Sequence, residues 1–404
     1  MQHDRGGGEA VDHSARQNSD RGPERRVVLH LITGLRTGGA ERMLCQLVSA
    51  IDRQRWEPVV VSLTDGSSPE AWLRGQGIRV YNLGMAPGKI PSPIVGIKLI
   101  RLVRRIRPDV IHGWMYHANV AAQLAALFLS RRTPVMWSIH HSIGGLSVEK
   151  KMTAGVIRLG ARLSRLPDKI VYASQVSRAQ HVSLGYNDRK GCLIPYGVDP
   201  DHFAASPAVR TAVRKELGLP VSGLVIGSLA RYHPMKDHEN LLRAAALLLR
   251  RPGMEAVQFL LAGTRVDHSN ADLQSLIGVL GIGDRVCLLG ERADSARLLS
   301  AMDLFTVSSS HGEALPMVLL EAMSCEVPCV TTDVGDAPLA VGDTGRVVAS
   351  RDPEALAGGW SELINAGGAT RRALGGAARQ KIINNYTLKV CAVAYEELYR
   401  SLTV

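Results

Sequence analysis

Cysteine is scarce and scattered in this 404-residue sequence, which has six cysteines and no C-x-x-C pair. Cys325 and Cys329 are four residues apart, but no histidine or second cysteine pair lies near them at a spacing typical of metal ligands. We therefore expect no zinc site and no other bound metal. The cysteine pattern favours a reduced, cytoplasmic protein.

Long hydrophobic runs are also missing. The N-terminus is polar and lacks the apolar core of a secretory signal. No apolar run approaches the roughly 20 residues that cross a bilayer, and the longest stretches, 118–129 and 241–249, have the length of buried helices. We expect a chain that does not span a membrane.

Aromatic residues are few, at 4% of the sequence with four Phe, whereas the net charge is +11. The positive charge predicts an anionic partner, such as a nucleotide diphosphate, an anionic lipid headgroup or nucleic acid. Nucleic acid fits least, because the sequence has no aromatic residues interleaved with basic ones and no helix-turn-helix or zinc-finger spacing. We expect no nucleic-acid partner.

The order of apolar segments predicts two α/β domains. Residues 1–24 are polar and contain several glycines, which is typical of a disordered tail. From Arg25 on, short β-branched runs alternate with helical patterns, which predicts parallel sheets with crossover helices. A polar break at 198–210 divides the pattern, so we expect doubly wound, Rossmann-like domains at 25–200 and 201–386, facing a central cleft. A last helix within 387–404 has no strand after it and is expected to pack back on the first domain.

The segment 308–333 carries the strongest functional signal. It predicts a strand ending near Ser310, then a helix beginning at Pro316, with Glu313 in the loop and Glu321 on the second helical turn. The free N–H groups of Met317 and Val318 would suit a diphosphate at the positive end of the helix dipole. Two glutamates this far apart are also common as solvated surface charges, but the strand–loop–helix setting argues against that interpretation.

A basic loop and a glycine loop add two weaker signals. Arg231 and Lys236 follow a predicted strand, where they could neutralise an anionic ligand or simply be solvated. Gly38 and Gly39 stand between a strand and a helix, where backbone N–H groups can approach a phosphate closely. The loop is not the G-x-G-x-x-G of dinucleotide-binding dehydrogenases.

Together these segments resemble the family-four, or group 1, retaining glycosyltransferases of the GT-B fold, from about Arg25 to Tyr399. Glu313 and Glu321 match the E-x7-E motif of that family, which implies that the first binds donor-sugar hydroxyls and the second the ribose. Arg231 and Lys236 match its R-x4-K pair, which implies that they hold the leaving diphosphate without a metal ion. Ala314 stands where the family usually has glycine, which puts the identity of the donor in doubt.

The resemblance implies further donor-site positions. The family places a histidine beside the donor sugar, and both His140 and His141 fit by spacing. His112 and His117 end another strand, but a lone histidine is more often structural. The remaining donor positions implied are Gly263, Leu289 and Leu315.

The expected reaction is metal-independent transfer of a hexose-type sugar from a nucleotide-diphosphate sugar, with no cofactor, retained anomeric configuration and front-face displacement. The acceptor expected is a glycan, a lipid-linked glycan or a polysaccharide precursor. Two basic amphipathic helices are expected at 94–108 and 148–167, and their apolar stripes predict ordinary packing on the core. The alternative is that the second helix binds anionic membrane peripherally on the cytoplasmic face. Alternative functions are a sugar-nucleotide epimerase of the same fold and a non-catalytic nucleotide-sugar sensor.

Overall fold

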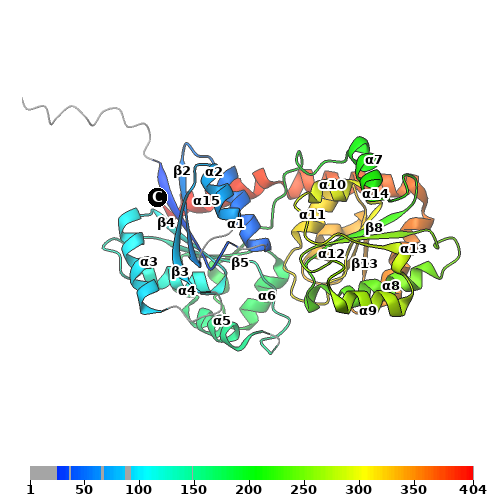
Figure 1. Cartoon of the computed structure of the whole chain (residues 1–404). Coiled ribbons are helices and arrows are strands. Elements are labelled where there is room, and N and C mark those ends of the chain that lie inside the picture. Colours follow the sequence, from blue (N-terminus) through cyan, green and yellow to red (C-terminus); the bar gives the residue numbers. More distant parts are fainter. Residues whose placement is uncertain (1–24, 36–37, 65–67, 87–91, 148, 404) are drawn as a thin grey trace, which may run out of the picture.

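The computed structural model describes residues 25–35, 38–64, 68–86, 92–147 and 149–403. The predicted tail at 1–24 lies outside the described residues. In Figure 1 the chain forms two lobes, each with a central sheet covered by helices.

The first lobe contains a seven-stranded parallel sheet in the order β3-β2-β1-β4-β5-β6-β7. The order reverses between β1 and β4, which is the topology of a doubly wound sheet. Its strands are β1 (Arg26–Ile32), β2 (Trp56–Thr64), β3 (Arg79–Met85), β4 (Val110–Trp114), β5 (Val135–Ile139), β6 (Lys169–Tyr172) and β7 (Gly191–Leu193). Its helices are α1 (Gly39–Ala50), α2 (Ser68–Gly75), α3 (Pro93–Ile106), α4 (Met115–Ala126), α5 (Lys151–Leu163) and α6 (Gln175–Ser183).

The second lobe repeats this plan with six parallel strands in the order β10-β9-β8-β11-β12-β13. The strands are β8 (Val225–Leu229), β9 (Gln258–Ala262), β10 (Val286–Leu288), β11 (Leu304–Val307), β12 (Cys329–Thr332) and β13 (Arg346–Val348). The helices are α7 (Pro207–Glu216), α8 (His238–Leu249), α9 (Ala271–Leu280), α10 (Ser295–Ser300), α11 (Met317–Ser324), α12 (Ala337–Val341) and α13 (Pro353–Asn365). Two doubly wound α/β lobes, as predicted, bring the carboxyl ends of two sheets toward each other.

The chain passes between the lobes twice, at neighbouring points. Val198 donates its N–H to Tyr386 and accepts one from Leu388, so the outgoing and returning segments pair. Helix α14 (Gly367–Asn385) packs on α11 in the second lobe, and α15 (Leu388–Leu402), red in Figure 1, returns to pack against α1. The buried rings of Tyr395 and Tyr399 anchor α15 in the first lobe.

Buried apolar residues form three clusters. One lies between the first sheet and α3, α4 and α5, and another lies between the second sheet and α8, α9 and α13. The third runs through both lobes and includes Tyr196 and Val198 from one side and Leu315 and Met317 from the other. The lobes therefore share a continuous apolar core beside the facing strand ends.

Candidate active site between the two lobes

The basic loop after β8 reaches the glutamate loop after β11. A short turn, Pro234–Lys236, directs the Lys236 ammonium to the Glu313 carboxylate, and the two form an ion pair. The Ser309 hydroxyl donates a second hydrogen bond to the same carboxylate oxygen at 2.6 Å. The structure thus brings together one residue from each of the two sequence motifs.

Glu313 is buried but remains the more acidic of the two motif glutamates. Burial raises its pKa, but the charge and hydrogen bond of Lys236, the hydrogen bond from Ser309 and the charge of Arg231 outweigh burial and leave the pKa below its ordinary value. A carboxylate held ionised at neutral pH can accept hydrogen bonds from the hydroxyls of a polyol.

Glu321 lies on α11 and faces the other lobe. Its side chain is 1% exposed, and its carboxylate lies 2.9 Å from the guanidinium of Arg42 on α1. Burial raises the pKa of Glu321, and the charge of Arg42 offsets only part of this effect. Pro316 is the N-cap residue of α11, not its first helical residue as predicted, because its backbone is extended and the helix begins at Met317.

The glycine loop opposes the basic loop from the first lobe. Gly38 is the N-cap of α1, and the carboxylate of Glu41, in the first turn, folds back against it. Burial raises the pKa of Glu41, and the nearby charge of Arg231 lowers it by less, so that the pKa lies above its ordinary value. The sequence analysis did not identify Glu41 and Arg42, although both follow the Gly38–Gly39 pair after a single alanine.

Two glycines allow the site loops to approach each other. Gly263 has a φ of +150°, and a Cβ there would overlap the carbonyl of Ala230, next to Arg231. Gly335 has a φ of +61°, and a Cβ there would overlap the carbonyl of Glu313. Any other residue at either position would push aside the loop that carries a charged site residue.

The two candidate histidines have different surroundings. His140 is buried between the rings of Trp114 and Tyr196, stacked at centroid distances of 4.9 and 5.4 Å. Neither ring nitrogen of His140 has a partner among the described residues, and burial lowers its pKa to about 3. His141 is half-buried and pairs through Nε2 with Glu149 at 2.7 Å.

The remaining predicted positions are two histidines of the first lobe and four donor positions of the second lobe. His112 is a core residue whose ring nitrogens contact Tyr399 and Ser138 at 2.9 and 2.5 Å, which matches the structural interpretation. The neighbouring His117 is half-buried, and burial lowers its pKa. Leu289 follows β10 and bonds through its N–H to Leu261. The other donor positions lie before or at the start of α11, where Leu315 and Met317 are buried and Val318 is partly exposed.

A second contact joins the lobes beside the site. The Asp336 carboxylate, from the loop before α12, accepts the backbone N–H groups of Gln175 and Val176 at 2.6 and 3.0 Å. These are free donors at the start of α6 in the first lobe. With the Arg42–Glu321 pair, this contact gives two polar links between the lobes near the site.

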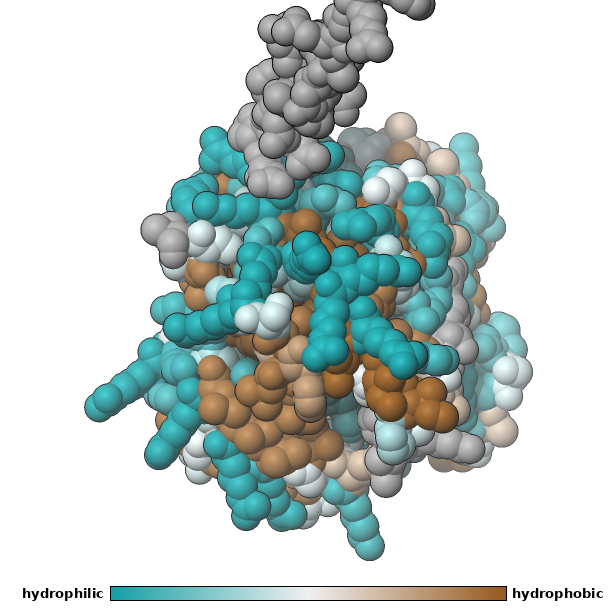
Figure 2. Space-filling model, turned by 90° about the vertical axis from the view of Figure 1, so that its left-hand side faces the viewer, coloured by the Kyte–Doolittle hydropathy of each residue, from teal (hydrophilic) through white to brown (hydrophobic). Residues whose placement is uncertain are grey.

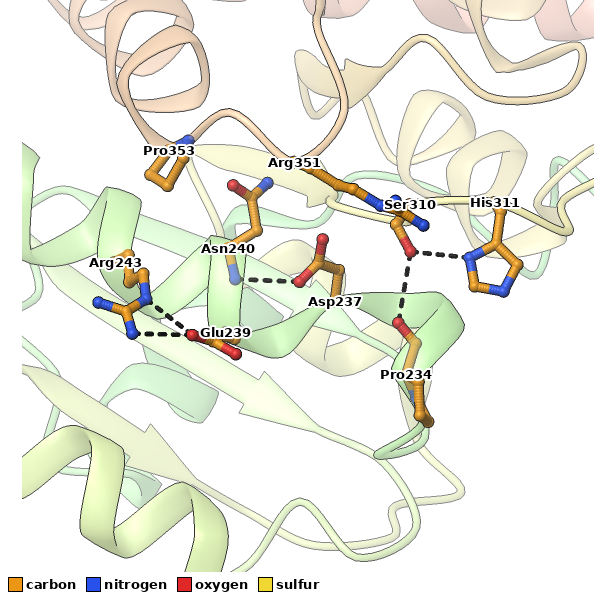
Figure 3. Close-up of a pocket in the computed structure, with 9 residues that line it drawn as sticks. All are labelled: Pro234, Asp237, Glu239, Asn240, Arg243, Ser310, His311, Arg351 and Pro353. Atoms are coloured by element: carbon orange, nitrogen blue, oxygen red, sulfur yellow. Dashed lines mark hydrogen bonds and ion pairs between the residues drawn. The ribbon is translucent and has the colours of Figure 1, made fainter. Parts of the chain in front are cut away.

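A shallow pocket lies next to the ion pair, on the second lobe (Figure 3). It is lined by Pro234, Ser310 and His311 from the two site loops and by Asp237, Glu239, Asn240, Arg243, Arg351 and Pro353. Asp237 caps α8 through the N–H of Asn240, and Arg243 pairs with Glu239. None of the predicted site residues lines this pocket, so we assign the site to the loops and not to the pocket.

Family models match both lobes. A model described as Glycosyltransferase Family 4 matches residues 37–202, and one described as Glycosyl transferases group 1 matches residues 223–366. The chain belongs to the group 1 glycosyltransferases.

Curated relatives of this glycosyltransferase include D-inositol 3-phosphate glycosyltransferases. The protein of Mycolicibacterium smegmatis is 34% identical over 206 residues, which is 49% of this chain and 44% of the relative. The protein of Stackebrandtia nassauensis is 27% identical over 387 residues, which is 85% of this chain and 84% of the relative. The chain thus spans under half the length of the mycobacterial relative that it matches.

Solved structures share the GT-B fold. Anabaena HepE, solved in complex with UDP and glucose, superposes with a TM-score of 0.82 at 22% sequence identity. The match covers 93% of this chain and 100% of the HepE chain. Sucrose-phosphate synthase of Thermosynechococcus elongatus has a TM-score of 0.78 at 20% identity, with 93% of this chain covering 99% of that chain. At these identities the likeness establishes the fold alone.

The described residues contain neither a cluster of metal ligands nor a helix that could cross a membrane. Among them, no group of three or more His, Cys, Asp or Glu side chains is placed to hold a metal ion. Within the same residues, every helix is too short or too polar to cross a membrane.

Proposed function

We propose that this group 1 glycosyltransferase moves a hexose-type sugar from a nucleotide-diphosphate sugar to an acceptor, with retention of anomeric configuration and without a metal ion. The observation that carries the proposal is the ion pair between Lys236 and Glu313. It unites the cation expected at the leaving diphosphate with the carboxylate expected at the donor sugar.

The charged residues around this pair suit the parts of such a donor. Arg231 and Lys236 would bind the leaving diphosphate, whose developing charge a fixed cation stabilises more in a dry cleft than in water. Glu313 would accept hydrogen bonds from the sugar hydroxyls and Glu321 from the ribose. Anabaena HepE, which has the same fold, was solved with UDP and with UDP-glucose.

Donor binding would replace two contacts of the free protein. Lys236 forms an ion pair with the carboxylate of Glu313, and Arg42 forms an ion pair with the carboxylate of Glu321. A diphosphate would draw Lys236 away from Glu313, and a ribose would take the place of Arg42 at Glu321. At Glu313 a hydrogen bond from a hydroxyl would replace the one from Lys236. At Glu321, whose two oxygens have no hydrogen-bond partner among the described residues, the ribose hydroxyls would supply one, which limits the cost of breaking the ion pair.

The remaining residues support front-face displacement. The leaving phosphate oxygen would take the acceptor proton as the acceptor attacks the same face of the sugar, so no protein nucleophile is required. We propose that His140 binds the donor sugar, because both of its ring nitrogens are buried and have no partner in the part of the chain that the structure describes, whereas Nε2 of His141 pairs with Glu149. The N–H groups of Gly38 and Gly39 would approach the diphosphate from the first lobe.

The acceptor proposed is a lipid-linked glycan or polysaccharide precursor at the cytoplasmic face of a membrane. Two features support an anionic or membrane-bound acceptor: the net charge of +11 and the basic helices of the first lobe. The inositol phosphate named for the curated relatives offers another acceptor class with an anionic group.

Donor turnover tests the proposal against its two rivals. Without an acceptor, the purified chain should hydrolyse a nucleotide sugar slowly. Proton NMR of the product should show the same anomeric configuration as the donor. The rate should not fall when EDTA is added. An inverted product or loss of activity in EDTA would contradict retention or metal independence. A sensor would bind without turnover, and an epimerase would change the sugar without releasing it from the nucleotide.

A further inference from the structure

The face of the first lobe formed by α3, α4 and α5 exposes an unusual number of large apolar side chains. Helix α4 lies between the other two and packs on both. Eight of the seventeen exposed large hydrophobic residues in the described chain belong to these helices or to their ends: Ile94, Ile97, Leu124, Leu127, Phe128, Met152, Leu159 and Leu166. Leu127 is 65% exposed and Phe128 is 51% exposed.

The same face is positively charged throughout. Segments 93–108, 115–134 and 150–167 contain twelve Lys and Arg residues and no Asp or Glu. All twelve side chains are exposed. Only Arg131 and Arg132 form ion pairs with described residues, with Asp109 and Asp168 at the edge of the face.

Figure 2 views the molecule from the side on which α3 lies in Figure 1. Apolar residues gather there into a patch, and long hydrophilic side chains project around it. Arg104 at the end of α3 donates to the carbonyl of Phe128, which fixes the basic end of one helix beside the apolar end of the next.

We infer that this face docks on an anionic lipid bilayer. Exposed aliphatic and aromatic side chains among basic ones fit the boundary between headgroups and acyl chains, with the cations bound to anionic headgroups. Nucleic acid would use the charges but not Leu124, Leu127 or Phe128. A second copy of this chain would present the same uncompensated cations and be repelled.

The docking face extends to the candidate active site. In a parallel sheet with crossover helices, each helix begins near the carboxyl ends of the strands, which is the edge that faces the other lobe. Helix α5 begins at Lys151, two residues after Glu149, whose carboxylate pairs with His141. The inference rests on the proposed function, because it supplies the surface that brings this enzyme to a lipid-linked acceptor.

Vesicle flotation of the full chain tests the docking face. We expect binding to vesicles of phosphatidylcholine with phosphatidylglycerol at low salt, weaker binding at moderate salt, and none to phosphatidylcholine alone. Arg158→Gln with Arg162→Gln should weaken binding at least tenfold, since each cation near an anionic surface contributes about fivefold. Leu127→Gln with Phe128→Gln should weaken it at both salt concentrations.

Matched controls lie on the second lobe. Arg250→Gln with Arg372→Gln removes two exposed cations, and Val279→Gln removes an apolar side chain that is 82% exposed. Neither should change flotation. No binding at either salt concentration, or equal loss in the controls, overturns the inference. The inference is also overturned if the double arginine substitution weakens binding but the Leu127→Gln, Phe128→Gln variant binds like the wild type. Binding of single-stranded RNA would then identify the partner as nucleic acid.

Thermal stabilisation by UDP, measured on the same preparations, separates the two proposals. Stabilisation by UDP without flotation refutes the docking face alone. Flotation without stabilisation by any nucleoside diphosphate leaves the docking face intact and refutes the proposed function.

Discussion

The guanidinium of Arg42 on α1 lies 2.9 Å from the carboxylate of Glu321 on α11, so a salt bridge joins the two lobes across the site. Glu321 is almost completely buried, whereas the Arg42 side chain is 43% exposed. A buried carboxylate with one half-exposed partner is held in an unfavourable state that a ligand with two hydroxyl donors could relieve. This contact between the lobes is therefore one that the proposed donor would replace.

The first prediction concerns this salt bridge. Arg42→Ala should lower the free energy of unfolding by about 1 kcal/mol, because it leaves Glu321 buried without its partner. In a Glu321→Gln background the same substitution should cost much less, since no charge remains to be compensated. Thermal or urea unfolding of the four proteins gives the coupling energy. Equal effects of Arg42→Ala in both backgrounds would mean that the pair contributes nothing.

The second prediction concerns pH. The pKa of Glu321 is raised in the folded protein, so the folded state binds its proton more tightly than the unfolded state does. Ionisation of Glu321 therefore reduces stability as the pH rises above the ordinary range of a glutamate. Glu321→Gln should unfold at a temperature a few degrees higher than the wild type at pH 8, and the difference should shrink toward pH 4. A difference that stays constant with pH would rule out this cause.

The third prediction concerns turnover. Lys236→Ala and Glu313→Ala should each lower donor turnover by about 100-fold or more. Each substitution removes a fixed charge that is proposed to contact the donor, Lys236 at the leaving diphosphate and Glu313 at the sugar. Lys215→Ala, at an exposed position on α7, is the matched control and should leave the rate unchanged. Melting temperatures confirm that the variants fold. A near-normal rate in either variant would exclude that residue from the mechanism.

The fourth prediction separates the two neighbouring histidines. His140→Phe keeps the stacking between Trp114 and Tyr196 but removes both buried ring nitrogens, so stability should be retained while turnover falls at least tenfold. Burial lowers the pKa of His140 to about 3, so its ring is neutral at the working pH and should not titrate in the rate profile between pH 5 and 8. His141→Phe should have the smaller effect on turnover. The reverse order would move the sugar contact to His141.

Local sequence patterns predict most of the strands and the two-lobe plan. The runs at β1 and β9 are short and mostly apolar, and the turn residues around them mark where they end. Helix α14 is not predicted, because its four glycines disfavour a helix and its apolar residues form no clear stripe. It forms through packing: Gly375 lies directly against the carbonyl of Glu326, where a Cβ would not fit.

The site could be predicted only as separate motifs. Spacing indicates that Arg231, Lys236, Glu313 and Glu321 belong to loops at strand ends, but it does not say which charges meet. The Arg42–Glu321 pair joins residues far apart in the sequence and depends on how the lobes pack. The burial of His140 likewise depends on Tyr196 and Trp114, which come from other segments.

The most direct measurement is thermal stabilisation of the wild type and of Lys236→Ala by a panel of nucleotide sugars. A donor at 100 times its Kd stabilises the folded protein by about 2.7 kcal/mol, so at least one nucleotide-diphosphate sugar should raise the melting temperature of the wild type clearly. The shift should largely disappear in Lys236→Ala. If no nucleotide sugar shifts the wild type, or if the variant shifts equally, the four charged residues do not form a donor site.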